Sequence, residues 1–369
     1  MILKSIEYCE NKDTPHYWEI QGVEFGQLNL IVGINATGKT LLLNAISRLA
    51  KFMSPNLKSY QSIIQDPIIA DGHWKIEFYD KTENIVVTYE LEIARFDIKA
   101  ENITADEKAV LNRINDTVKV YTKEGMLFDE YRGGLGSSLS ILHSYPIPAK
   151  LLYWARTCRL YPFDDRNQFE VYSEGKKENE DAPIIISTLM GLLKNNGTKE
   201  KLMEDFNYIG YPVDDIYIEP LKHQHISIIE AYVKEKGLLF PTAFYRMSQG
   251  MFRAFTSIAI IEDLLLNNSE CTLVIDDIGE GLDFDRSSKL IKLIFNKLKG
   301  SNIQFIAATN NRFLINAVDI RDLNILERDG HVVKSYNYSN SKEQFDEFEF
   351  TGLGSFDLFR FQMYKTQEV

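Results

Sequence analysis

Apolar and polar positions near the start of the chain predict strands followed by a helix. Residues 1–32 have an extended pattern, and Leu28–Val32 is a mostly apolar run that ends at Gly33. An apolar run bounded by glycine is typical of a strand buried on both faces. Residues 40–52 then carry leucine, isoleucine and alanine at helical spacing on one broad face. The sequence therefore predicts a strand, a glycine-bounded loop and an amphipathic helix.

The middle of the chain has a different pattern. Residues 73–131 contain three stretches in which apolar and polar residues alternate, HWKIEFYD, IVVTYELEIA and TVKVYTKEG. Such alternation indicates antiparallel strands with one face exposed to solvent. Residues 138–205 are expected to be more helical, interrupted by a polar loop at residues 173–181. Residues 216–241 return to extended segments.

The last third alternates strands and helices. A long helix is predicted from Ser248 to about residue 266, followed by a strand (272–275), a helix (286–298), a strand (303–309) and a helix (313–318). That order is typical of a parallel α/β sheet. Asp329-Gly330 predicts a tight turn between two short strands. We expect residues 1–54 and 241–369 to form one composite α/β domain, with antiparallel strands and a helical insertion contributed by residues 55–240.

Composition narrows the class of protein. The chain has 369 residues, of which 44 % are hydrophobic, and a net charge of −12. No apolar run reaches the ~18 residues that a spanning helix needs, so we expect no membrane association. Three scattered cysteines favour neither a disulfide framework nor a zinc site. These features predict a cytoplasmic protein. The net negative charge disfavours a protein that binds nucleic acid through its overall charge, but it allows a local basic groove.

The loop after the first buried strand carries the clearest chemistry. Residues 33–40, GINATGKT, match the phosphate-loop pattern G-x-x-x-x-G-K-[ST]. Its glycines let backbone N–H groups turn inward on a phosphate, its lysine reaches the β- and γ-phosphates, and its threonine hydroxyl ligates Mg²⁺. We expect ATP and Mg²⁺ as ligands. The predicted nucleotide contacts in this loop are Gly33, Asn35, Ala36, Thr37, Gly38, Lys39, Thr40 and Leu41.

Two later segments fit the same site. The apolar strand 272–275 ends in Asp276 and Asp277, and a carboxylate at the end of such a strand is where a water-mediated Mg²⁺ ligand is needed. The alternative is a pair of turn aspartates. Ser248 opens the long helix, and for this residue alone a simple N-cap is the better interpretation.

Taken together, the motifs resemble the ABC-type ATPase clan. The phosphate loop, SQGMFR (248–253), IDDIGEGLD (275–283) and ATNN (308–311) occur in that clan's order. The chain looks most like stand-alone RecF/SMC-like bacterial ATPases, in particular those found beside a TOPRIM-type nuclease in anti-phage operons, such as the ATPase of PARIS-type systems. The resemblance implies a P-loop fold with a mixed α+β insertion between the phosphate loop and the signature motif.

The resemblance also assigns roles. It implies a head-to-tail homodimer that sandwiches two ATP molecules. In one subunit Lys39, Thr40 and Asp276 would act on the nucleotide, and Asp276 would hold Mg²⁺ through water. The second subunit would contribute Ser248, Gln249 and Gly250. Asp283 would lie near the dimer seam, and Arg253 would position the signature helix.

Two departures from the family concern hydrolysis. The family usually has Glu at the position of Asp277 and His at the position of Asn310. A shorter carboxylate and an uncharged amide both predict slow turnover, and Glu280 is a candidate substitute base. The predicted catalytic set is Asp277, Lys39, Asn310 and Glu280. Gln61 and Gln65 are candidates for the family's Q-loop glutamine, and neither is assigned.

These expectations lead to one function and two alternatives. The resemblance implies an ATPase that dimerises on ATP and signals to an effector protein in anti-phage defence, with a TOPRIM-type nuclease as the candidate effector. The first alternative is a RecF-like repair ATPase that binds DNA directly, and the second is a passive nucleotide sensor. The aromatic segment Phe345–Phe361 is expected either to close the core or to form a docking surface.

Overall fold

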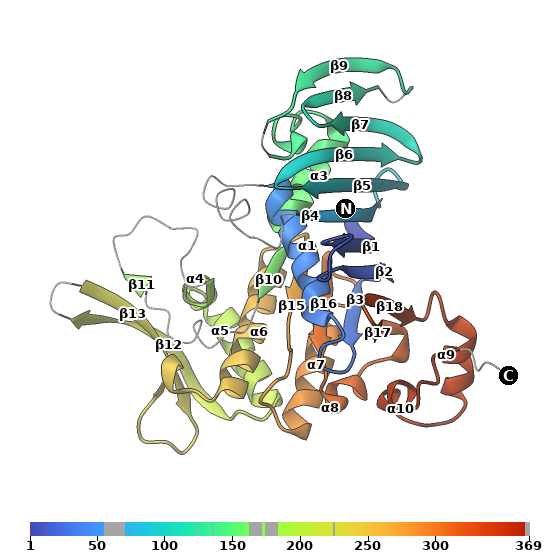
Figure 1. Ribbon diagram of the computed structural model, residues 1–369. Helices are drawn as coiled ribbons and strands as arrows, with labels where there is room; N and C mark the ends of the chain where they lie inside the picture. Colours follow the sequence, from blue (N-terminus) through green and yellow to red (C-terminus); the bar gives the residue numbers. More distant parts are fainter. Residues whose placement is uncertain are drawn as a thin grey trace.

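The computed structural model describes residues 1–54, 71–122, 124–134, 136–161, 172–173, 184–223 and 226–365. A long curved sheet runs through the molecule, with helices on both faces of its lower part and an antiparallel wing above that α3 (Pro146–Thr157) and the neighbouring turns cover on one face (Figure 1). Gln61, Gln65 and nearly all of the predicted polar loop 173–181 lie outside the described residues.

The sheet has 14 strands in the order β10-β15-β16-β3-β17-β18-β2-β1-β4-β5-β6-β7-β8-β9. Neighbours from β10 to β17 are parallel, as are β18 and β2, whereas β17–β18 and all pairs from β2 through β1 to β9 are antiparallel. The bounds are β1 Ile2–Glu10, β2 Trp18–Glu24, β3 Leu28–Val32, β4 Asp71–Asp80, β5 Ile85–Ala94, β6 Asp97–Ala105, β7 Lys108–Ile114, β8 Thr117–Tyr121, β9 Leu127–Arg132, β10 Arg159–Tyr161, β15 Cys271–Ile275, β16 Ile303–Thr309, β17 Leu323–Asp329 and β18 Val332–Asn337.

Hydrophobic cores lie on both faces of the parallel part. Along β3, Leu30 and Val32 join one core while Ile31 joins the other, as alternation in a strand requires. Helices α1 (Lys39–Met53) and α3 (Pro146–Thr157) belong to the core that contains Ile31. The opposite core is packed by α6 (Gln249–Leu266), α7 (Phe284–Leu298) and α8 (Arg312–Ile315). The predicted strand buried on both faces and the strand–loop–helix unit are confirmed.

The antiparallel wing also matches its predicted pattern. The three alternating stretches form β4, β5 and β8, and β6 and β7 lie between them. Alternate residues of β4, such as Trp74, Ile76 and Phe78, are buried, whereas their neighbours are exposed or half-buried. β4 pairs with β1, so the wing continues the sheet of the α/β part without a break.

One strand of the core sheet comes from an unexpected part of the chain. β10 lies within residues 55–240, and it pairs in parallel with β15 at the edge of the sheet. A three-residue strand has no recognisable sequence period, because its identity depends on the edge that it joins. Residues 159–161 therefore sit beside the strand that ends in Asp276.

A second, smaller sheet stands beside the helices. Its four strands are β11 (Tyr172–Ser173), β12 (Val213–His223), β13 (Ile226–Glu235) and β14 (Thr242–Ala243), with β12 and β13 forming a long hairpin. Helices α4 (Ile184–Leu192) and α5 (Asn196–Tyr208) pack on α6. In Figure 1 the hairpin extends sideways from these helices, away from the long sheet.

The C-terminal part closes the core beside β17 and β18. Asp329 and Gly330 form the predicted turn between these strands. The helix predicted at 313–318 is shorter, because α8 ends at Ile315 and the side chain of Asn316 instead accepts a hydrogen bond from the N–H of Phe356 (2.7 Å). Helices α9 (Lys342–Glu349) and α10 (Ser355–Arg360) follow.

The aromatic C-terminal segment is buried in part, and its docking role stays a prediction. Phe345 and Phe348 are buried in the core, whereas Phe350 is 92 % exposed and Phe361 is 56 % exposed. Two rings therefore close the core and two remain at the surface. None of the helices in the described part of the chain is both long enough and apolar enough to cross a membrane.

Candidate functional site

The phosphate loop connects β3 to α1 at the carboxyl end of the parallel strands. Ala36 and Gly38 have positive φ angles of 63° and 99°, which turn the loop back on itself. A Cβ at Gly33 would lie 2.5 Å from the hydroxyl oxygen of Thr37, so only glycine fits there. That hydroxyl donates to the carbonyl of Ile34 (2.8 Å). The loop is thus preformed, and it leads into the N-terminus of a 15-residue helix, which favours an anion.

Lys39 lies folded under this loop. Its Nζ donates to the carbonyl oxygens of Gly33 (2.9 Å) and Ile34 (3.1 Å), and the residue is buried. Burial lowers the pKa of Lys39, and the nearby carboxylates of Asp277 and Asp276 oppose this shift. A cation that is desolvated and held by two carbonyls can exchange them for phosphate oxygens, which compensate its charge better.

Asp276 meets the phosphate loop from the end of β15. The Thr40 hydroxyl is hydrogen-bonded to its carboxylate, although β15 and β3 are separated by β16 in the sheet. Burial raises the pKa of Asp276, and the bond from Thr40 opposes this shift. A hydroxyl and a carboxylate oxygen side by side are hard ligands of the kind that Mg²⁺ prefers. The two residues therefore fit the metal that the sequence predicts at this position.

Asp277 stands at the surface in an unusual backbone conformation. Its φ angle is +47°, a region that asparagine and aspartate tolerate far better than glutamate. Its N–H donates to the carboxylate of Asp276 (3.0 Å), and its carbonyl accepts from the N–H of Glu280 (3.2 Å). The backbone therefore gives a local reason for aspartate at a position where the family usually has glutamate.

Asn310 reaches the phosphate loop from the end of β16. Its side-chain Nδ2 donates to Oδ1 of Asn35 (2.9 Å), a residue 275 positions earlier in the chain. Both side chains are exposed. The bond places an amide, in place of the family's imidazole, at the edge of the phosphate loop.

Ser248, Gln249 and Gly250, which we call the signature turn, lie at the N-terminus of α6. The Ser248 hydroxyl accepts a hydrogen bond from the N–H of Met251 (3.3 Å), so the predicted N-cap is present. Ser248 and Gln249 are exposed. A Cβ at Gly250 would lie 2.3 Å from the carbonyl oxygen of Gly281, so the turn is packed backbone against backbone on residues 279–283, which we call the GEGLD segment.

The structure thus brings the predicted residues together in two separate groups. Lys39, Thr40, Asp276 and Asp277 converge with Asn310 on the phosphate loop. The signature turn instead joins the GEGLD segment, which contains Glu280 and Asp283. Asp283 caps α7 by accepting from the N–H of Arg286 (3.0 Å).

Sequence reasoning missed Trp18, Arg328 and Glu10. They line a cavity of about 420 Å³ together with the phosphate-loop residues Asn35–Ala36 and Gly38–Leu41 and with Asp277. The Arg328 guanidinium lies 4.3 Å from the centre of the Trp18 ring and donates to the carbonyl of Ala36 (3.3 Å). No sequence motif marks these residues, because Trp18 and Arg328 are brought together only by the β18–β2 pairing.

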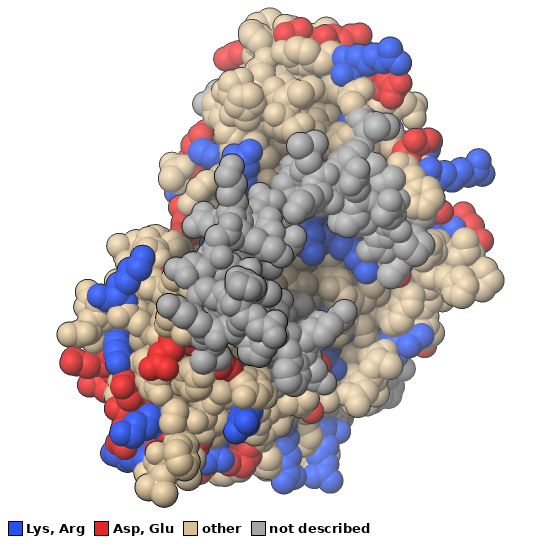
Figure 2. All heavy atoms as spheres, turned by 90° about the vertical axis from the view of Figure 1, so that its left-hand side faces the viewer, with Lys and Arg blue, Asp and Glu red and all other residues tan. Residues whose placement is uncertain are grey.

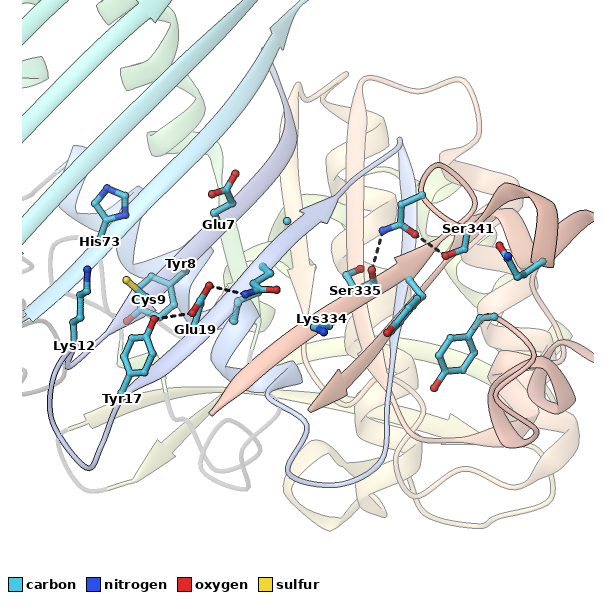
Figure 3. A pocket seen from close by; sticks show the side chains of 17 residues that line it. Glu7, Tyr8, Cys9, Lys12, Tyr17, Glu19, His73, Lys334, Ser335 and Ser341 are labelled. Carbon is cyan, nitrogen blue, oxygen red and sulfur yellow. Dashed lines mark hydrogen bonds between the residues drawn. The ribbon is translucent and has the colours of Figure 1, made fainter. Parts of the chain in front are cut away.

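A larger cavity, of about 750 Å³, lies elsewhere (Figure 3). It is formed on the face of β1, β2 and β4 where Cys9 stands opposite both Glu19 and His73. Glu19 accepts from Tyr17 (2.7 Å) and from Gln21 (2.8 Å). None of the predicted site residues lines this cavity. Within the described residues, no group of three or more metal-ligating His, Cys, Asp or Glu side chains is present.

Comparisons with known proteins give a match only at the level of structure. No family model matches the sequence, and no curated protein matches it. The SMC head bound to the C-winged helix domain of ScpA superimposes with a TM-score of 0.54 at 13 % identity, covering 93 % of this chain and all of that one. The fold is that of an SMC head. An SMC head with an extended coiled coil, bound to the C-terminal domain of ScpA from Pyrococcus furiosus, superimposes with a TM-score of 0.52 at 12 % identity. This match covers 94 % of this chain and 99 % of that one.

The SMC-head fold confirms the predicted fold class. The chain is a mixed α/β protein with the ABC-type P-loop ATPase fold, and the match extends over most of its length. At this identity the comparison establishes the fold alone. The subgroup with a role in anti-phage defence stays a prediction.

Proposed function

We propose that this chain binds Mg²⁺-ATP and closes around it as a head-to-tail pair. The observation that carries the proposal is the convergence of Lys39, Thr40 and Asp276 on one preformed loop within an SMC-head fold. The phosphates would occupy the loop 33–41, with Thr40 and Asp276 holding Mg²⁺, the latter through water. Mg²⁺ would neutralise the charge that develops on the phosphates during transfer.

The second half of the site would come from another copy of the chain. Ser248 and Gln249 of the signature turn are exposed, and the N-terminus of the 18-residue helix α6 attracts anions. Its Ser248 hydroxyl already accepts one bond, and it remains able to donate a hydrogen bond to a phosphate oxygen. Ser248, Gln249 and Gly250 would cover the γ-phosphate held by the partner, which makes ATP the link between the two subunits.

Trp18 and Arg328 would hold the nucleoside. Their side chains line the same cavity as Gly38 and Lys39, so a base attached to phosphates in the loop would lie against them. An indole ring offers a face for stacking, and the guanidinium that lies over it can rotate outward to the ribose or the α-phosphate.

Hydrolysis is expected to be slow. Asp277 would orient the attacking water, and Glu280 is the candidate that could replace it as the base. Asn310 would contact the γ-phosphate. Neither Asp277 nor Asn310 is the residue that the family usually has at that position. In-line attack depends on placement to within about 1 Å, so a carboxylate one methylene shorter leaves the water poorly held. The ATP-bound pair would therefore be long-lived and suited to signalling.

An effector protein would read that state, with a TOPRIM-type nuclease of an anti-phage system as the candidate. The two SMC heads above are bound to domains of ScpA, which shows that this fold can carry a protein partner. Direct DNA binding is the alternative. Figure 2 shows acidic and basic side chains interspersed around one face, with a small group of Lys and Arg in a central hollow. A mixed surface favours a protein partner over a duplex, whose binding needs a basic stripe.

Mass measurement with and without Mg²⁺-ATP tests the proposal. The wild type should shift from monomer to dimer, and Lys39→Ala should remain monomeric because it loses the phosphate contact. Ser248→Arg should bind ATP as a monomer, because only the surface offered to the partner is blocked. Lys51→Ala, an exposed lysine on the same helix α1, is the matched control and should dimerise. A wild type that binds no ATP, or a Ser248→Arg variant that dimerises, contradicts the proposal.

A further inference from the structure

Arg286, near the start of α7, connects the GEGLD segment to the inserted part of the chain. Its Nη1 donates to the carboxylate of Asp283 (2.7 Å). Its Nε and Nη2 both donate to the carbonyl oxygen of Gly210 (3.3 and 3.2 Å). The guanidinium also lies 4.3 Å from the centre of the Tyr211 ring. Gly210 and Tyr211 lie between α5 and β12, so a single planar group joins Asp283 to the base of the hairpin.

Tyr211 extends this connection to α6, the helix that begins at the signature turn. Its ring is stacked on Phe206 of α5, with ring centres 4.9 Å apart. Phe206 packs edge-on against Phe255 of α6 (5.1 Å), and Phe255 packs in turn against Phe244 (4.9 Å). Phe206 and Phe255 are fully buried. A close-packed interior transmits displacement rather than absorbing it, so the base of the hairpin and α6 are expected to move together.

Ion pairs between charged side chains also connect α5, α6 and α7 to one another. Lys297 of α7 lies 2.8 Å from both Asp205 of α5 and Glu262 of α6. Lys201 of α5 lies 3.0 Å from Glu262. The side chains of Asp205, Glu262 and Lys297 are at most 15 % exposed, so their pairing is only weakly screened by solvent.

The backbone conformation of the GEGLD segment depends on contacts from neighbouring residues. Gly279 and Gly281 both have positive φ angles, at 76° and 78°, and glycine is the residue with the most backbone freedom. The middle of the segment, at Gly281, packs on Gly250, and the segment ends in Asp283, whose carboxylate accepts a hydrogen bond from Arg286. Removing the guanidinium would leave the segment connected to the hairpin only indirectly, through α6 and α7.

We propose that Arg286 is a positioning residue that couples the GEGLD segment to the β12–β13 hairpin, so that closure of the ATP-bound pair is transmitted to the hairpin. This inference rests on the proposed function, because the GEGLD segment and the signature turn would lie at the seam between the two subunits. The hairpin is the element that extends farthest from the helices on this side (Figure 1). It would present the nucleotide state to the effector, and Arg286 would act through Asp283 and not on the nucleotide.

Hydrogen exchange of the hairpin, with and without Mg²⁺-ATP, measures this coupling directly. In the wild type, ATP should change the protection of residues 213–223 and 226–235. Arg286→Ala should lose that change while binding ATP normally, and its kcat should fall about tenfold with KM within about twofold, the pattern of a variant that binds the nucleotide but positions the reacting groups poorly. Arg286→Lys keeps the charge but not the planar fork, so it should not restore the hairpin response.

Arg321→Ala is the matched control. Arg321 also pairs with carboxylates, Glu349 (2.8 Å) and Asp319 (3.7 Å), and lies over a tyrosine ring, 5.1 Å from the centre of Tyr338, but it is in the C-terminal part. It should keep the hairpin response. If Arg286→Ala and Arg286→Lys behave like Arg321→Ala while the wild type dimerises, the coupling is wrong and the proposed function stands. If the wild type stays monomeric with ATP, both are wrong. If Arg286→Ala does not fold, Arg286→Lys decides.

Discussion

Gly250→Ala tests the packing of the signature turn on the GEGLD segment. A Cβ at this position would lie 2.3 Å from the carbonyl oxygen and 2.7 Å from the carbonyl carbon of Gly281. Both atoms belong to the backbone, so no side chain can rotate away. Restoring an ordinary contact of about 3.4 Å requires the two segments to separate by about 1.1 Å. The substitution therefore moves two predicted parts of the sandwich site relative to each other.

The expected effects on catalysis and on stability differ greatly in size. A displacement of about 1 Å in groups that position a reacting substrate can lower the rate about 100-fold. Overpacking of this kind costs about 1–3 kcal/mol of stability, a modest change in the melting temperature of a chain this long. We therefore expect a folded Gly250→Ala protein with kcat lowered about 100-fold and weaker ATP-dependent dimerisation.

Steady-state ATP hydrolysis, mass measurement and thermal unfolding together check this expectation. Gly191→Ala is the matched control, because Gly191 lies in α4 and its nearest atom to a new Cβ would be Asp263 Oδ1 at an ordinary 3.7 Å. The control should be as active as the wild type. Wild-type hydrolysis and dimerisation by Gly250→Ala would refute the reasoning.

Three further substitutions test other parts of the structure. Asp277→Glu should raise kcat by extending the carboxylate towards the water, while losing about 1 kcal/mol of stability at the positive φ of +47°; an unchanged kcat would remove Asp277 from the catalytic set. Lys297→Met should cost about 3 kcal/mol at pH 8, because it leaves Asp205 and Glu262 buried without their shared cation. Burial raises the pKa of Asp205, so denaturant titrations should show the loss shrinking towards pH 5 as this carboxylate protonates, and a loss independent of pH would contradict this. Burial and the neighbouring Asp319 raise the pKa of Asp322 to about 6, above its unfolded value near 3.8, so its contribution to stability is present below pH 4 and lost as the pH rises to 6. Asp322→Asn should therefore gain about 1 kcal/mol at pH 7, after allowance for solvent screening, and flatten the unfolding free energy between pH 4 and 6.

The sequence alone was enough to predict the elements whose signals are local. The apolar run of β3, the GINATGKT loop and the spacing of α1 each lie within about ten residues, and the structure has them where predicted. Alternation likewise predicted β4, β5 and β8, because a strand with one solvent-exposed face has an apolar side chain at every second residue. The length of α8 was predicted wrongly, since its end depends on Asn316 bonding to Phe356, 40 residues away.

Only the tertiary structure decided which distant residues meet. Trp18 lies under Arg328, Asn310 bonds to Asn35, Gly250 packs on Gly281 and Arg286 bonds to Gly210. Each of these contacts depends on the order of strands in the sheet or on the packing of one helix against another. A local pattern specifies that a segment is a strand or a helix and which of its faces is apolar. It does not specify the neighbour, because many partners offer an equally apolar face and only the whole fold selects one.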